Sequence, residues 1–97
     1  MAKRQYEVVE SEGITFFFAY DKDAPDILHI YVRHLTEIDD ALDVFFDGQS
    51  TWNSKHERFE TYNTTHGLFW FWLNQKERKV MVITCFKQEE SSYESDA

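Results

Sequence analysis

The sequence is poor in the residues that would cross-link or sharply bend a chain: it has one cysteine, one proline and three glycines among 97 residues. A single cysteine excludes an intrachain disulfide, and the place of Cys85 inside an apolar run is typical of a small buried side chain. Basic residues are also few. Ten lysines and arginines face eighteen aspartates and glutamates, for a formal net charge of −8. Because binding to nucleic acid needs a basic footprint, this balance argues against direct contact with DNA or RNA.

Long apolar runs are missing as well. The longest, Leu68 to Leu73, is far shorter than the about 20 residues that a membrane-spanning helix needs. The first residues, Met1 to Tyr6, carry positive charge but are not followed by the apolar core of a signal peptide. We therefore expect a cytoplasmic protein with no membrane partner. The four histidines show no zinc-type spacing, so we also expect no metal site and no cofactor.

Aromatic residues are abundant, at 18% of the chain, and can supply one sizeable core. The pattern predicts a single α+β domain over residues 1–87 and a disordered acidic tail over 88–97, because the tail is too polar to offset its ordering entropy. We expect an antiparallel sheet of five to six strands with one helix packed on it, in the order β-β-β-α-β-β-β. The expected strands cover residues 6–10, 14–20, 27–33, 57–64, 68–73 and 79–86.

The helix is predicted between Thr36, as its N-cap, and Gly48, as its C-terminal stop. Ile38, Ala41, Leu42 and Phe45 fall at helical spacing and form one apolar stripe. Residues 49–56 are polar apart from one tryptophan and are predicted to form a loop.

The strand at 68–73 is apolar on both sides, with the two tryptophans Trp70 and Trp72 on one side and Phe69 and Phe71 on the other. One short helix cannot cover both faces of a sheet of this width. Either the sheet curls on itself, or its second face meets a second copy or another protein. The tryptophans expected at such an interface are Trp52, Trp70 and Trp72.

The predicted helix carries five acidic residues and no basic one: Glu37, Asp39, Asp40, Asp43 and Asp47. Acids in the first turn are favoured by the helix dipole, whereas Asp47 in the last turn is disfavoured. Like charges three or four residues apart also repel each other. The face is either the solvated surface of an acidic protein or a surface that docks on a basic partner by imitating phosphates.

A catalytic alternative comes from Arg33, His34, His56, Arg58 and Tyr62. If they converged, they could serve acid–base cleavage of RNA, which needs proton transfer and stabilisation of phosphate charge. The stretch from Arg33 to Gly48, with the strands that end at Val80 to Phe86, resembles the small RelE-type toxin-fold proteins of the BrnT kind. This resemblance covers residues 33–86. It implies the fold of a ribonuclease that is held inactive by a bound antitoxin.

Our main hypothesis is a non-enzymatic module whose acidic face docks on a basic, nucleic-acid-binding protein and inhibits it. Phage anti-defence inhibitors, antitoxins and immunity proteins fit this description. The alternatives are a ribonuclease of the toxin fold, or an inactive relative of one, and a homodimeric structural protein.

Overall fold

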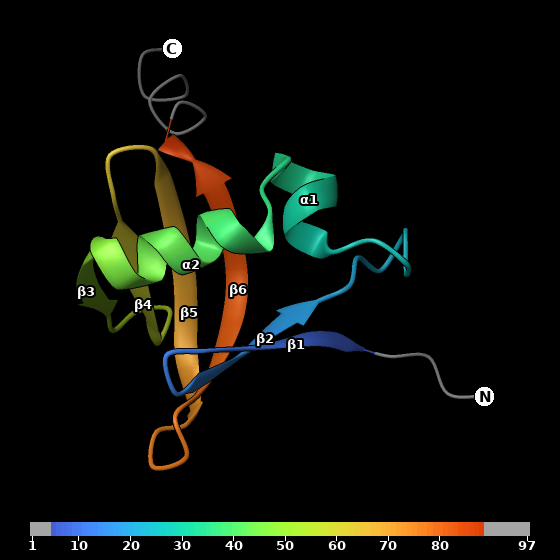
Figure 1. The fold of residues 1–97 in the computed structure, drawn as a ribbon. Helices are drawn as coiled ribbons and strands as arrows, with labels where there is room; N and C mark the ends of the chain where they lie inside the picture. The colour runs from blue at the N-terminus through green and yellow to red at the C-terminus, as the bar shows by residue number, and fades with distance from the viewer. Residues whose placement is uncertain (1–4, 89–97) are drawn as a thin grey trace.

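The computed structural model of the chain describes residues 5–88 (Figure 1). They form two helices and six strands, and all six strands belong to one sheet in the order β1-β2-β6-β5-β4-β3. The α+β class is therefore confirmed. The elements in chain order are β1 (Tyr6–Ser11), β2 (Ile14–Ala19), α1 (His29–His34), α2 (Ile38–Asp47), β3 (Gln49–Asn53), β4 (Arg58–Tyr62), β5 (His66–Asn74) and β6 (Lys79–Lys87).

The first two strands form a hairpin. Glu12 and Gly13 connect them, and both have positive φ angles, of 51° and 78°. A two-residue turn with two positive φ angles matches the right-handed twist of the strands that it joins. The register pairs Ser11 with Ile14 and Tyr6 with Ala19, so the hairpin is regular along its length.

The sheet is mixed rather than antiparallel, which corrects the predicted arrangement. β2 runs parallel to β6, with Phe16 opposite Val80 and Phe18 opposite Val82, whereas every other neighbouring pair is antiparallel. A parallel pair needs a long crossover connection. Here both helices and three strands lie between β2 and β6 along the chain.

The prediction of a strand over residues 27–33 is wrong, because the structure has helix α1 there. Only Ile30 of this short helix is buried. The helix ends at Leu35, whose φ is 55°, and the backbone N–H of Leu35 donates to the carbonyl of Tyr31. The bond from Leu35 is that of an αL-type helix ending, and the N–H of Thr36 donates to the carbonyl of Ile30. The sheet is therefore covered by two helices instead of one.

The second helix occupies its predicted place but starts differently. Glu37, not Thr36, is the N-cap, and it forms a capping box with Asp40. Thr36 is fully buried instead, with its hydroxyl 3.0 Å from the carbonyl oxygen of Ile30 and 2.9 Å from that of Cys85. Gly48 ends the helix as expected, although its φ is −84°. Glycine is needed there for space, since a Cβ would lie 2.6 Å from the carbonyl oxygen of Val44.

The predicted loop over 49–56 is also corrected, because residues 49–53 form the edge strand β3. Four of its five residues are exposed. Such a strand is held by backbone hydrogen bonds to β4 and shows no apolar alternation. Residues 89–97 of the predicted tail lie outside the described residues, and the N–H of Gln88 donates to the carbonyl of Thr65.

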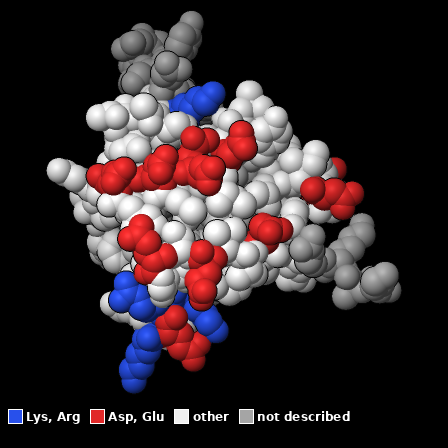
Figure 2. All heavy atoms as spheres, in the orientation of Figure 1, with Lys and Arg blue, Asp and Glu red and all other residues white. Residues whose placement is uncertain are grey.

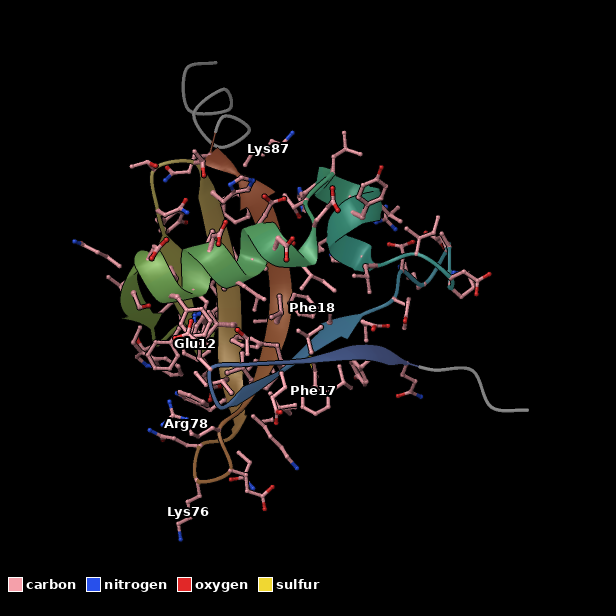
Figure 3. All side chains as sticks on the ribbon, viewed as in Figure 1. Glu12, Phe17, Phe18, Lys76, Arg78 and Lys87 are labelled. Atoms are coloured by element: carbon pink, nitrogen blue, oxygen red, sulfur yellow. The ribbon has the colours of Figure 1, made fainter. Side chains whose placement is uncertain are left out.

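The core lies between the two helices and one face of the sheet. Consecutive residues of β2 point to opposite sides, with Phe18 toward the helices and Phe17 away from them (Figure 3). Ile30 of α1 and Val44 of α2 complete the same cluster. Its buried residues are Ile14, Phe16, Phe18, Ile30, Ala41, Val44, Leu68, Trp70, Val80, Val82 and Cys85.

Candidate protein-binding surfaces

The outer side of α2 carries a band of carboxylates, which we name the acidic ridge. Figure 2 shows acidic side chains side by side along the helix, across the visible face of the molecule. The last turn of α2 contains no basic residue. The side chains of the ridge are exposed except that of Asp40, which is half-buried. The ridge consists of the five predicted acids, Glu37, Asp39, Asp40, Asp43 and Asp47.

Two of these acids hold the helix itself. The carboxylate of Asp40 accepts a hydrogen bond of 2.9 Å from the backbone N–H of Glu37, and the side chain of Glu37 accepts one from the N–H of Asp40. The other carboxylate oxygen of Asp40 lies 3.9 Å from Nε2 of His66 on β5. Asp40 therefore has a structural role that its spacing alone did not reveal.

The other three acids have no such role. Within residues 5–88, no hydrogen bond or ion pair involves the side chain of Asp39, Asp43 or Asp47. Asp43 lies four residues from each of the other two, and like charges at that spacing destabilise a helix by about 0.2–0.5 kcal/mol per pair. Asp47 adds an unfavourable interaction with the negative end of the helix dipole. Asp39 lies in the first turn, where the helix dipole favours a negative charge, but the fold gains nothing from the charges of Asp43 and Asp47 to offset that cost.

The three predicted tryptophans lie in different surroundings. Trp52 on the edge strand β3 is 53% exposed, and its ring packs edge-on against Phe59 at 4.9 Å between centroids. Trp70 is in the core, where its indole N–H donates to the hydroxyl of Thr61 at 2.8 Å. Trp72 is half-buried against the core. Trp52 and Trp72 line one open cavity of about 460 Å³, together with Phe59, Phe71, Glu57 and Gln75.

The face of the sheet opposite the helices is a second apolar surface. Val8, Phe17, Met81 and Phe71 are neighbours across four strands, which places them in one row on that face. A second row joins Glu60, Phe69 and Thr84. The rings of this face shield one another in part, so that Phe17, Phe69 and Phe71 are half-buried although both described helices pack on the other side. Tyr62, Phe69 and Phe86 form one aromatic group there.

The residues proposed for RNA cleavage are mostly engaged with other groups. Arg33 donates from Nε to the buried carboxylate of Asp21 at 3.0 Å and from a terminal nitrogen to Asp23 at 2.9 Å. Arg58 pairs with Glu60 at 2.9 Å, and its guanidinium carbon lies 4.0 Å from the ring centroid of Phe69.

The rings of His34 and Tyr62 each lie 6.1 Å from that of Phe86, between centroids. Arg58 and Tyr62 in turn both approach the ring of Phe69. Burial, with the nearby charge of Glu60, raises the pKa of the Tyr62 phenol. A raised pKa keeps the hydroxyl protonated at neutral pH. His56 follows β3 in an exposed turn, where its backbone N–H donates to the side chain of Asn53.

A cluster that sequence reasoning missed surrounds Asp21, which is only 2% exposed. Burial raises the pKa of this carboxyl, but the N–H of Asp23 and the guanidinium of Arg33 outweigh that effect and lower the pKa below its usual value. His29 lies 3.5 Å from the same carboxylate. The cluster fastens the 20–28 segment to α1, and its members are too far apart in sequence to form a local motif.

Comparisons of the chain with protein-family models, with curated proteins and with solved structures find no match. Neither described helix is long and apolar enough to cross a membrane. Over residues 5–88, no group of three or more histidine, cysteine, aspartate or glutamate side chains is placed to hold a metal ion.

Proposed function

We propose that this protein is an acidic module that docks on a basic, nucleic-acid-binding protein and inhibits it. The observation that carries the proposal is the pair of exposed carboxylates, Asp43 and Asp47, which destabilise α2 and have no counter-charge within residues 5–88. A helix that keeps unfavourable charges without any internal gain often does so for binding.

The spacing of the ridge resembles that of a phosphate backbone. A helix rises about 1.5 Å per residue, so the four aspartates from Asp39 to Asp47 extend over about 12 Å. That is roughly one negative charge per 4 Å, against about 3.4 Å per phosphate along one strand of DNA. A protein groove built to hold one nucleic acid strand would therefore meet a similar density of charge on α2. Occupying that groove would exclude the nucleic acid.

An anchor lies at one end of the ridge. Strand β3 begins at Gln49, one residue after α2 ends, and lies beside the C-terminal end of that helix (Figure 1). The strand carries the exposed side chain of Trp52. Aromatic side chains commonly provide the fixed contacts of an interface, whereas charges set its association rate. We therefore assign the rate of encounter to the ridge and the lifetime of the complex to Trp52.

The experiment compares three forms of the chain: wild type, the ridge variant D43N/D47N, and the control variant E10Q/E12Q. The control removes the same charge from two exposed positions outside α2. Each form is immobilised and exposed to extract of the native host, and captured proteins are identified by mass spectrometry. Association and dissociation rates are then measured for each purified partner, with and without a competing DNA or RNA duplex.

The proposal predicts a basic partner that wild type and E10Q/E12Q bind equally and that D43N/D47N binds more slowly. The loss should shrink as salt rises, because screening weakens the same attraction. Nucleic acid should compete with wild type for the partner. A partner whose association rate is the same for D43N/D47N and E10Q/E12Q at low salt would refute docking through the ridge.

A further inference from the structure

An open groove of about 350 Å³ lies between the segment before α1, α1 itself and the start of α2. Its apolar lining includes Ile27, Tyr31 and Ile38, and three carboxylate residues complete it: Asp26, Glu37 and Asp39. Among residues 5–88, no basic side chain lines the groove. Ile27 and Tyr31 are 46% and 47% exposed, so this apolar lining is open to a ligand.

This combination matches one kind of side chain. Arginine has a long aliphatic stem that can lie along apolar surface, and a planar cation that stacks on an aromatic ring and bonds carboxylates in pairs. Tyr31 provides the ring, and Asp26 and Asp39 provide exposed carboxylates. A neutral apolar side chain would leave those carboxylates without a counter-charge, and an acidic one would be repelled.

The helix dipole does not reverse this preference. The start of α2 carries the equivalent of about half a positive charge. Glu37 and Asp39 each place a full negative charge at the same end of the helix, and Asp26 adds a third from the preceding segment. The groove is therefore negative overall, although it lies beside a helix N-terminus.

We infer that this groove receives an arginine side chain of the basic partner, an inference that rests on the proposed function. Glu37 and Asp39 belong to both the groove and the ridge, so the pocket continues the docking surface. The ridge attracts the partner by charge alone. The groove also requires a side chain that fits it, so binding depends on the position of an arginine on the partner surface.

The inference is tested without the partner. The full chain, labelled with ¹⁵N, is titrated by NMR with the peptide acetyl-Gly-Arg-Gly-amide and, separately, with the same peptide carrying citrulline, which has the shape of arginine but no charge. The ionic strength is held at about 0.15 M. The Debye length is then about 8 Å, which limits the attraction of the peptide to distant charges. Three variants are compared with wild type: Tyr31→Ala, Tyr31→Phe and the control variant E10Q/E12Q, whose positions lie outside the groove.

We expect the arginine peptide to shift the amide signals of residues 26–39, and the citrulline peptide to leave them unchanged. Tyr31→Ala should weaken arginine binding about five-fold, in line with the loss of a cation–π contact at an exposed site. Tyr31→Phe keeps the ring and should retain binding, and E10Q/E12Q should remain within about two-fold of wild type because both of its changes lie outside the groove and the ridge. Equal binding of the two peptides, shifts confined to other residues, or an unchanged affinity in Tyr31→Ala would each overturn the inference.

The two proposals can fail separately. If D43N/D47N slows partner binding but the arginine peptide does not bind the groove, docking by the ridge stands and the arginine pocket is wrong. If the peptide binds but no basic partner depends on the ridge, the pocket stands and the proposed function is wrong.

Discussion

Removing two charges from the ridge should make the protein more stable, which is unusual for a change at a proposed binding surface. The variant is D43N/D47N. Asp40 is left intact because its carboxylate accepts the N–H of Glu37 and so caps α2. Asparagine and aspartate have similar helix propensities, so the comparison isolates charge.

The magnitude follows from the positions of the charges. Asp43 faces Asp39, Asp40 and Asp47 at spacings of three or four residues, and each relieved pair contributes about 0.2–0.5 kcal/mol. Removing Asp47 from the last turn also ends an unfavourable interaction with the dipole, which adds about 0.3–1 kcal/mol. We expect the free energy of unfolding to rise by roughly 1–2 kcal/mol. In a domain of this size the melting temperature should rise by about 4–8 °C per kcal/mol.

Thermal unfolding followed by circular dichroism, at low and at high salt, measures this gain. Salt screens exposed charges, so the difference between the variant and wild type should narrow as salt increases. The control variant E10Q/E12Q should shift the melting temperature much less. An unchanged or lower melting temperature for D43N/D47N would refute the reasoning, because it would mean that Asp43 or Asp47 has a stabilising partner.

Three further predictions concern the interior. Thr61→Val should lower the free energy of unfolding by about 1–3 kcal/mol in denaturant titrations, because it leaves the buried indole N–H of Trp70 without its acceptor; Thr61→Ser should restore most of the loss, and equal stability of all three would contradict the role of this hydrogen bond. Burial raises the pKa of the Cys85 thiol to about 12, so iodoacetamide near neutral pH should modify the unfolded chain and leave the native one intact, as mass spectrometry can show. The lowered pKa of Asp21 contributes stability that is present above the unfolded pKa of about 3.9 and is lost as pH falls through the lower folded value. Asp21→Asn should therefore melt earlier than wild type at neutral pH, with the difference disappearing in acid, whereas a difference independent of pH would mean that charge plays no part.

Elements with a strong local signal were predictable from the sequence. Glu12-Gly13 between two apolar runs specifies a hairpin turn, and the stripe from Ile38 to Phe45 specifies a helix. Strands β5 and β6 were predictable because their sequences are apolar on both sides of the strand. In each case the structure is specified by residues that are close in sequence or that recur at a fixed spacing.

Elements decided by distant contacts were not predictable. Helix α1 exists because Arg33 reaches back to the carboxylate of Asp21 and because Ile30 enters the core, and neither contact changes the local alternation that favoured a strand. Strand β3 is held by backbone pairing at an edge, for which exposed polar residues give no signal. The parallel pairing of β2 with β6 follows from the path of the whole chain, whereas alternation reports only which face a residue occupies.

The candidate site likewise contains residues that the sequence could place and residues that only the fold places. Helical spacing was sufficient to place Asp40, Asp43 and Asp47 on one ridge, with Asp39 four residues before Asp43, and charge counting suggested a basic partner. The separation of Trp70 from Trp52 was not foreseeable, since the two rings differ only in what the fold places over them. The groove beside Tyr31 was invisible from the sequence for the same reason, because its walls come from α1 and α2, which the prediction did not bring together.

The size of α2 implies that the ridge cannot be the whole interface. A ten-residue helix is about 15 Å long and 10 Å wide, and this area is a small part of the about 800 Å² that each partner contributes to a standard interface. The neighbouring α1 can supply more, because Tyr31, Val32 and Leu35 are 47%, 37% and 64% exposed. Leu35 is notable because a large side chain sits at a positive φ of 55° and still points into solvent. Leu35 adds its exposed side chain to those of Tyr31 and Val32, so the surface that extends from the ridge across the groove to α1 is the one that we expect a partner to cover.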